Sequence, residues 1–330
     1  MHTSRRAFVS ALASMTAAAA WPLSSHAAEA EIRTLRILVG FPPGGASDSV
    51  ARRMADSLHP GYAQTAVVDN RPGADGKLAL NEMNRSPADG SVMVVQPETV
   101  LTVAPYADPK NAMFYLADVA SVTSCALVRQ AFAVGPQVPA SVKTLKDFFD
   151  WAKAHPQLAN CGSPGPNSPQ GILLNILSKQ INVPLNHVPY KGSAPGIVDL
   201  LGGQIAGMLS PVGDYLPHLK EGRLRLLGMA SAKRSIFAPD TQTFQELGFP
   251  DMTIDDTCGI VMAKNTPAEI QNRVATAIAA VIATPETAQA FAQMGLEPLS
   301  STPAEYTRTV NQNAARWIER IKASGVKLNG

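Results

Sequence analysis

The sequence lacks the short motifs that carry most protein catalysis. It contains no Cys-x-x-Cys, no His-Glu-x-x-His, no phosphate-loop signature and no Gly-x-Ser-x-Gly elbow. The histidines beyond residue 30 are scattered and do not stand at metal-ligand spacing. They are His59, His155, His187 and His218. We therefore expect no metal, no cofactor and no catalytic residue. Because a Ser–His–Asp triad is a spatial rather than a sequential arrangement, a hydrolase stays open as an alternative.

Cysteine and net charge are both scarce. The three cysteines, Cys125, Cys161 and Cys258, form an odd set at wide spacing. An oxidising compartment would permit one disulfide among them, and buried free thiols are the expectation. The net charge is +2 over 330 residues. A balance so near neutral argues against nucleic acid or an anionic membrane as a partner.

Residues 1–30 have the composition of an export signal. Ser4-Arg5-Arg6-Ala7-Phe8-Val9 fits a twin-arginine motif, and an Ala-rich stretch follows until Pro22. Small residues then offer cleavage after Ala28 or Ala30. The apolar stretch is too short and too polar for a stable membrane span. A general secretory signal that holds two arginines is the alternative, and either route predicts a periplasmic protein.

The remaining chain alternates between strand and helix patterns. Because its length exceeds that at which one core stops growing, we expect two lobes. The order of the first half implies a parallel sheet with crossover helices. Strands are expected at 35–41, 65–70, 91–96, 158–162, 185–188, 205–209 and 224–229. Helices are expected at 47–59, 75–85, 145–154, 168–180, 194–202 and 213–220.

The last third is helical. Thr266-Pro267-Ala268-Glu269 and Thr302-Pro303-Ala304-Glu305 each fit a capping box with proline at the first helical position. Thr284-Pro285 begins another helix. In the final helix an apolar stripe from Tyr306 to Ile321 indicates a core-facing surface.

A Gly-rich turn follows the first expected strand. It reads Phe41-Pro42-Pro43-Gly44-Gly45-Ala46-Ser47-Asp48 and leads into a segment with amphipathic helical spacing. The prolines stiffen the approach and the glycines remove Cβ atoms. We predict that Ser47 caps the helix, with Asp48 in its first turn. Free N–H groups at such a helix start form a cradle for an anion, although a capped turn without a ligand is the alternative.

Similar strand-to-helix turns recur in the chain. They are Cys161–Ser168, Gly192–Gly196 and Met208–Asp214. Several such turns together suggest converging N–H and hydroxyl donors, which suit carboxylate oxygens without a paired arginine. Ordinary loop chemistry is the alternative for each turn taken singly.

These motifs together resemble the Bug family, the periplasmic substrate-binding components of tripartite tricarboxylate transporters. The resemblance covers essentially the whole chain after residue 30, including Phe41–Asp48, Asp69–Gly76, Val188–Pro195 and Asp199–Lys220. It implies an α/β fold, a two-lobed periplasmic binding protein of type II-like form. Each lobe would be a mixed sheet flanked by helices, and two crossing strands near 124–128 and 255–262 would join the lobes. The expected lobes are 31–126 with 256–330, and 127–255.

The resemblance also implies a function. A small organic carboxylate would bind between the lobes of a monomer and be delivered to membrane permease subunits. A protein that presents the bound form to a sensor kinase is an alternative, and an exported hydrolase is another.

The site residues follow from the same resemblance. Pro43, Gly44, Gly45, Ala46, Ser47 and Asp48 would hold a carboxylate from the first lobe. Gly162, Ser163, Gly165 and Ser168 would hold it from the second lobe. Glu98 and Thr99 would line the pocket and help to select the distal group. Ser210 and Asp214, from the last of the recurring turns, complete the expected set.

The chain departs from the family pattern at three positions. Gly171 stands where a histidine is frequent, Ser210 where an aspartate is common, and Cys258 where an aromatic residue usually precedes the glycine. Losing an acidic group at 210 removes a partner for an ammonium or hydroxyl on the ligand. This weakens the case for an amino-acid ligand.

Overall fold

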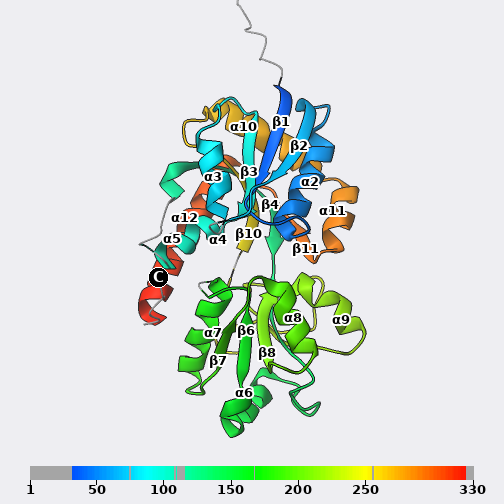
Figure 1. Ribbon diagram of the computed structural model, residues 1–330, viewed down its shortest axis with the longest axis vertical. Helices are drawn as coiled ribbons and strands as arrows, with labels where there is room; N and C mark the ends of the chain where they lie inside the picture. Colours follow the sequence, from blue (N-terminus) through cyan, green and yellow to red (C-terminus); the bar gives the residue numbers. More distant parts are fainter. Residues whose placement is uncertain are drawn as a thin grey trace, which may run out of the picture. The chain divides into compact units, whose positions relative to one another are not determined.

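Two mixed sheets organise the chain in the computed structural model (Figure 1). The structure describes residues 32–73, 76–107, 109, 116–166, 168–254 and 256–324. The predicted export signal lies outside the described residues. From Ile32 onward the chain forms one unit by its internal contacts.

The first sheet has six strands in the order β11-β4-β10-β3-β1-β2. β1 pairs in parallel with β2 and with β3, whereas β10 is antiparallel to β3 and β4, and β11 is antiparallel to β4. The strands are β1 (Ile32–Val39), β2 (Ala63–Asn70), β3 (Val92–Pro97), β4 (Val119–Val128), β10 (Asp256–Ala263) and β11 (Leu296–Pro298).

Alternation along the strands gives this sheet two buried faces. Leu35, Ile37 and Val39 of β1 belong to one core cluster, while Leu38 belongs to another. The first cluster is covered by α2 (Ala46–Leu58), α10 (Ala268–Ile282) and α11 (Pro285–Ala292), and the second by α3 (Lys77–Asn84) and the short α4 (Thr99–Thr102). Figure 1 shows α2 and α3 on opposite sides of β1 and β3. A strand buried on both faces explains the continuous apolar run in the sequence. The short α5 (Ala104–Ala107) and η3 (Leu116–Asp118) precede β4.

The second sheet has five strands in the order β7-β6-β8-β5-β9. β6 pairs in parallel with β7 and β8, and β5 is antiparallel to β8 and β9. The strands are β5 (Gln130–Val134), β6 (Asn160–Ser163), β7 (Asn186–Pro189), β8 (Gly207–Pro211) and β9 (Arg225–Met229).

Helices again cover both faces of the second sheet. Phe132 of β5 packs toward α6 (Leu145–Ala154) and α7 (Pro169–Gln180), and its ring centroid lies 5.0 Å from that of Phe148. The neighbouring Ala133 faces the opposite cluster, which includes residues of α8 (Ser193–Leu201). Three short helical segments lie between the strands of this sheet along the chain. They are η4 (Pro156–Leu158), before β6, and η5 (Val212–Asp214) and α9 (Leu216–Lys220), between β8 and β9. The predicted mixed sheets flanked by helices are therefore confirmed.

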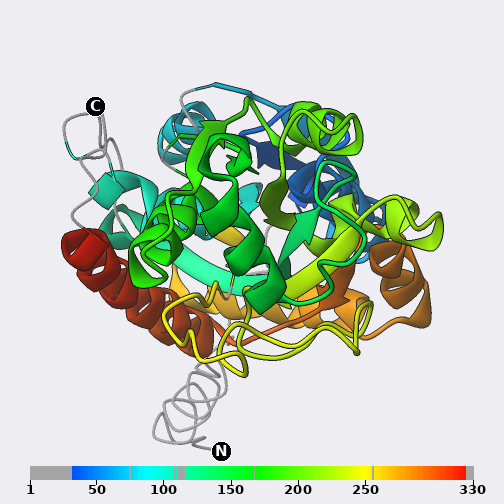
Figure 2. The same ribbon diagram turned by 90° about the horizontal axis from the view of Figure 1, so that it is seen from below.

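The two sheets are linked closely along the chain. Only Arg129 separates β4 of the first sheet from β5 of the second. The final helix, α12 (Pro303–Ser324), is drawn in red in Figure 2. Its Tyr306 and Val310 are buried, and its Trp317 belongs to the core of the second sheet. The expected lobe division assigns α12 to lobe 1, yet this helix also contributes to the second core.

Most predicted elements are confirmed, with boundaries moved by a few residues. The helix expected at 213–220 is divided into η5 and α9. Thr302 and Thr284 cap their helices through the amides of Glu305 and Thr287. The capping box predicted at Thr266 is wrong, because Pro267 takes the N-cap position and the buried Thr266 hydroxyl makes no hydrogen bond. All three cysteines are buried and free, as expected.

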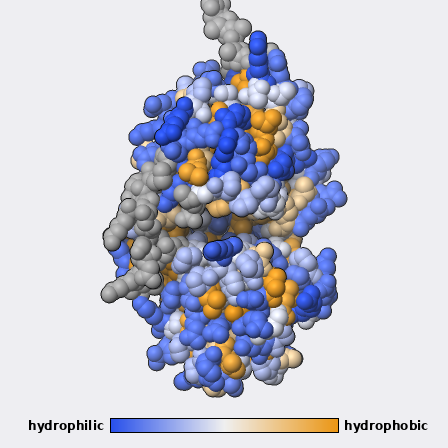
Figure 3. Space-filling model, viewed as in Figure 1, coloured by the Kyte–Doolittle hydropathy of each residue, from blue (hydrophilic) through white to orange (hydrophobic). Residues whose placement is uncertain are grey.

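The face of the molecule in Figure 3 is mostly hydrophilic, with apolar residues scattered over it. Among the described residues, no single helix has the length and hydropathy needed to cross a membrane. The pair α10 and α11, which meet at a bend of 75°, passes that test together by length and composition. Both helices bury apolar side chains in the first core, including Ile278 and Phe291.

Candidate functional site

A cavity of about 260 Å³ lies where strands of both sheets end. Phe41 follows β1, Thr99 follows β3, and the segment that joins β6 to α7 forms the other side. Ligands of open α/β sheets bind outside the carboxyl ends of parallel strands, so the topology points to this location. The lining residues are Phe41, Lys77, Thr99, Val100, Val103, Ala104, Pro164, Gly165, Pro166, Ser168 and Pro169.

Most of this lining is apolar, with a few polar groups. The polar side chains are those of Lys77, Thr99 and Ser168. Lys77 is the first residue of α3 and is 7% exposed. The sequence analysis missed it, although it directly follows the Asp69–Gly76 motif at a helix start. The cavity is smaller than the usual range of about 300–1,000 Å³ for drug-sized ligands, which favours a small ligand.

The turn after β1 departs from the prediction at Ser47. α2 begins at Ala46 with Gly45 as its N-cap, so the prediction that Ser47 caps the helix is wrong. Ser47 lies inside the first turn and is buried, where its hydroxyl accepts a hydrogen bond from the Cys258 thiol at 3.7 Å. Burial raises the pKa of that thiol to about 12. Ser47 therefore joins α2 to β10.

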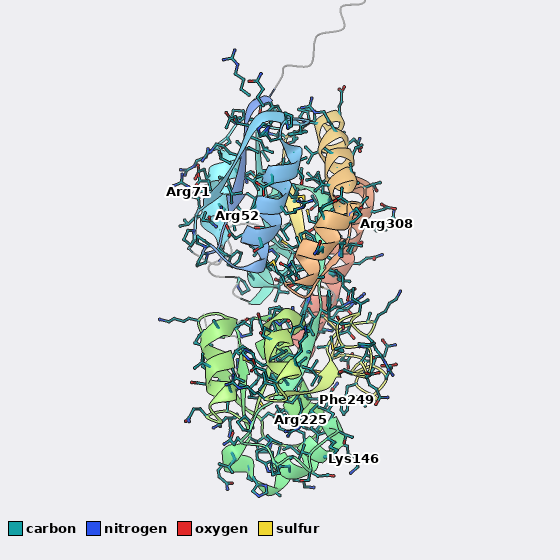
Figure 4. All side chains as sticks on the ribbon, turned by 90° about the vertical axis from the view of Figure 1, so that its right-hand side faces the viewer. Arg52, Arg71, Lys146, Arg225, Phe249 and Arg308 are labelled. Carbon is teal, nitrogen blue, oxygen red and sulfur yellow. The ribbon has the colours of Figure 1, made fainter. Side chains whose placement is uncertain are left out.

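Asp48 stands in the first turn of α2, as predicted, and holds the turn before it. Its carboxylate accepts hydrogen bonds from the Gly44 amide at 2.9 Å, from Arg52 at 2.9 and 3.0 Å, and from Asn70 at 2.9 Å. Burial alone would raise the pKa of Asp48, but these hydrogen bonds outweigh it and lower that pKa. Figure 4 shows Arg52 on α2, and Arg71 beyond the end of β2. The Asp48 network preorganises the exposed turn at Pro43, Gly44 and Gly45, in which Gly44 has φ of 91°.

The turn between β6 and α7 is held by serines. Ser168 is the N-cap of α7 and accepts a hydrogen bond from the Gly171 amide at 3.1 Å. The hydroxyls of Ser163 and Ser168 both donate to the carbonyl of Gly165, at 2.9 and 2.8 Å. Ser163 is fully buried and also lies 2.7 Å from Nε2 of His187. Burial lowers the pKa of His187, so the neutral imidazole is favoured.

At each of the three positions where the chain departs from the family pattern, a side chain from another element stands close by. The His187 ring occupies the space beside Gly171, since a Cβ there would lie 2.7 Å from its Cε1. The Ser210 hydroxyl donates to the Asp214 carboxylate at 2.6 Å, so an acidic group does stand at the end of β8. Burial raises the pKa of Asp214. Beside Gly259, which follows Cys258, the Tyr306 hydroxyl fills the space that a side chain would need.

Glu98 is engaged by distant elements. Its buried carboxylate accepts hydrogen bonds from Thr257 of β10 at 2.8 Å and from Asn313 of α12 at 2.6 Å. Its backbone carbonyl accepts from the amides that begin α4. These contacts hold the position of the adjacent Thr99, which lines the cavity.

The structure thus brings part of the predicted site together. Thr99, Gly165 and Ser168 line one cavity. The buried Gly162 and Ser163 lie in β6, and Ser210 lies near the end of β8. These two strands are parallel neighbours in the second sheet. Among the described residues, no group of three or more His, Cys, Asp or Glu side chains is placed to hold a metal ion.

A larger cavity of about 640 Å³ lies elsewhere, along α7 and α12. Its lining includes Lys179, Asp251, Arg316 and Arg320, and it contains none of the predicted site residues. It lies beside helix flanks rather than at strand ends. The smaller cavity, by contrast, is lined by the predicted site residues Thr99, Gly165 and Ser168.

Comparisons with known proteins agree with this architecture. The chain is similar to BugT of Bordetella pertussis, with 28% identity over 314 residues that cover 95% of each chain. A solved periplasmic transporter structure matches with a TM-score of 0.80 and 27% identity, covering 90% of this chain and 99% of that one. Rpa4515 of R. palustris, solved with adipate, matches with a TM-score of 0.79 and 26% identity over 89% and 97% of the two chains. These similarities confirm the resemblance to the Bug family. Residues 50–326 match the model of the TctC family, the tripartite tricarboxylate transporter family receptor, and the chain belongs to that family.

Proposed function

We propose that this receptor captures a small organic carboxylate in the cavity lined by Lys77, Thr99 and Ser168. The observation that carries the proposal is the meeting of a helix N-terminus and a lysine at this cavity. The N-terminus of α7 meets it at Ser168 and Pro169, and a lysine lines it from α3. Free N–H groups and the helix dipole favour an anion at a helix start. The adipate bound to the similar Rpa4515 supports a carboxylate in particular.

The first-turn amides of α2 provide the second set of donors in this proposal, and the Gly44 amide is not one of them because it donates to Asp48. The first-turn amides of α2 have no acceptor within the helix itself, as at any helix start. The Asp48 carboxylate holds the turn rigid, which lowers the entropy cost of ordering it around a ligand. We propose that the remaining site residues hold the ligand-contacting residues in place through contacts within the protein. They are Gly162, Ser163, Ser210 and Asp214.

Delivery is the second part of the proposal. The bound form is presented in the periplasm to the permease subunits of a tripartite transporter, in line with the family to which the chain belongs. The segment around Arg129 would act as a hinge, because Arg129 joins β4 of the first sheet to β5 of the second.

One contact favours a second candidate function. The Ser163 hydroxyl lies 2.7 Å from an imidazole nitrogen, which is the geometry of a nucleophile and its base. However, Ser163 is fully buried and its hydroxyl donates to the Gly165 carbonyl. This arrangement supports a structural role for the pair, and we propose binding without turnover.

Thermal unfolding against a panel of carboxylates and their uncharged amides tests the proposal. A ligand that binds only the folded state stabilises it by about 2.7 kcal/mol at a hundredfold excess over Kd. We expect at least one small carboxylate to raise the melting temperature, with one molecule bound per chain and no product formed. If no carboxylate at millimolar concentration raises it, or if amides act equally well, the proposal is wrong. Uptake of the binding carboxylate by cells with and without the gene then tests delivery.

A further inference from the structure

A group of contacts surrounds Arg129, the single residue that joins β4 to β5. It consists of Arg129, Val212–Gly213, Met294–Gly295 and Glu297, and we call it the Arg129 cluster. We propose that this cluster restrains the hinge and holds the two lobes in the arrangement in which both line the cavity of about 260 Å³. The consequence for ligand affinity rests on the proposed function.

Two glycines from different lobes meet backbone to backbone in this cluster. Gly213 belongs to η5, which follows β8 of the second sheet, and Gly295 lies between α11 and β11 of the first. A Cβ on Gly295 would lie 2.5 Å from the Gly213 Cα, and a Cβ on Gly213 would lie 2.9 Å from the Met294 carbonyl carbon. Because both partners are backbone atoms, no side chain can rotate away to relieve such a contact.

The glycine at position 213 is explained by this approach rather than by its own turn. Gly295 has φ of 65°, a conformation that favours glycine by itself. Gly213 has no such positive φ, and glycine weakens a helical turn relative to alanine. The missing side chain at Gly213 therefore serves the contact with the first lobe.

Arg129 is held on both sides by the same cluster. Its backbone carbonyl accepts a hydrogen bond at 2.8 Å from the amide of Val212, the neighbour of Gly213. Its guanidinium donates through Nε and Nη2 to the carboxylate of Glu297, two residues after Gly295. Both side chains of this pair are little exposed. A buried fork of this kind fixes direction, whereas its net contribution to stability is small.

These contacts limit how far the lobes can turn. A hinge residue absorbs lobe motion through changes in its φ and ψ. At Arg129 a large change would break the hydrogen bond from Val212, separate the guanidinium from Glu297 or part the two glycines. The lobes should therefore occupy a narrow range of orientations even without a ligand. Because an apparent dissociation constant rises as the binding-competent fraction falls, loosening the cluster should weaken binding without changing a ligand contact.

Double electron–electron resonance without a ligand tests the restraint. Spin labels on Val67→Cys of β2 and Asp150→Cys of α6 report the distance between the lobes, since both positions are exposed and the native cysteines are buried. We expect a narrow distance distribution in the labelled parent and a broader or shifted one with Gly213→Ala. Gly61→Ala is the matched control, because a Cβ there would meet no atom within 4 Å. A broad distribution in the parent, or an unchanged one in folded Gly213→Ala, would overturn the restraint.

Glu297→Gln tests the cluster from its other side. This change removes the charge opposite Arg129 at nearly constant size, and circular dichroism melting verifies that each variant folds. We expect the distribution to broaden here as well. If Gly213→Ala does not fold, Glu297→Gln gives the decisive result, and a parent-like distribution in it would contradict the restraint.

Titration calorimetry with adipate, the ligand solved with the similar Rpa4515, tests the consequence for binding. We expect the dissociation constant of Gly213→Ala to rise about fivefold or more, as it would if about one fifth or less of the molecules were competent to bind. Gly61→Ala should match the wild type. If no carboxylate binds the wild type, the proposed function fails while the spin-label result stands. If adipate binds Gly213→Ala and the wild type equally although the distances broaden, the inferred effect on affinity is wrong.

Discussion

Replacing Glu297 removes the carboxylate that holds a buried cation at the passage between the two sheets. Arg129, the single residue between β4 and β5, donates hydrogen bonds to Glu297 of β11 over distances of 3.1 to 3.3 Å. The two side chains are 9% and 14% exposed. Glu297 also accepts from the Ser235 hydroxyl at 3.3 Å and the Ile236 amide at 3.4 Å. The carboxylate therefore ties the first sheet to a loop beyond β9.

The expected cost follows from burial. With both side chains so little exposed, Glu297→Ala leaves the Arg129 guanidinium buried without its counter-charge. Breaking a buried pair in this way costs about 3–5 kcal/mol, a large part of the roughly 5–15 kcal/mol that stabilises a typical protein. Replacing both partners by apolar residues, Arg129→Met with Glu297→Leu, should recover much of this loss because no charge is then left unpaired.

Urea unfolding measured by circular dichroism gives the free energies for Glu297→Ala and for a cycle of Glu297→Leu, Arg129→Met and their double variant, which yields the coupling energy of the pair. The exposed pair Lys146–Asp150, whose side chains are 82% and 68% exposed, provides the control. Asp150→Ala should leave the midpoint nearly unchanged. A loss below about 1 kcal/mol for Glu297→Ala, or a coupling energy near zero, would refute the reasoning about burial.

Three further predictions concern single positions. Gly213→Ala should lower the free energy of unfolding by about 1–3 kcal/mol, because the new Cβ would lie 2.9 Å from the Met294 carbonyl carbon. An unchanged melting temperature would contradict this prediction. Ser168→Ala should cost about 1 kcal/mol through loss of the α7 N-cap and should weaken carboxylate binding, whereas wild-type affinity in titration would remove Ser168 from the site. Burial, reinforced by Glu98, raises the pKa of Asp256 well above 3.8, so the folded state holds this proton more tightly. Stability should therefore fall as pH rises from 3.8 toward that raised pKa, by at most about 1.4 kcal/mol per pH unit. Asp256→Asn should reduce this slope and be more stable at pH 7, and urea midpoints across pH that show the variant to be less stable would contradict the sign.

The fold was predictable because its signals are local. Alternating and helical spacings, with turn residues between them, follow from which faces are buried, and each strand and helix carries its own pattern. The chain before residue 42 reads as an apolar strand because β1 is buried on both faces. The failed cap at Thr266 shows the limit of such signals, because the proline that follows it takes the N-cap position itself.

The site was less predictable because its chemistry is assembled across distant elements. Gly171 and Ser210 are departures from the family pattern in the sequence, yet His187 and Asp214 bring an imidazole and a carboxylate to the same places. The spacing of residues along the chain does not predict that β7 lies beside β6, or that the His187 imidazole contacts Ser163. Lys77 was missed for the same reason, since only the packing of α3 brings it to the cavity.

A crystal structure of the protein with its tightest-binding carboxylate tests the central claim most directly. The account predicts the ligand in the cavity of about 260 Å³, with carboxylate oxygens within hydrogen-bond distance of Lys77 Nζ and of donors in the turn from Gly165 to Ser168. A carboxylate found instead in the cavity of about 640 Å³ along α7 and α12, with the smaller cavity empty, would contradict it.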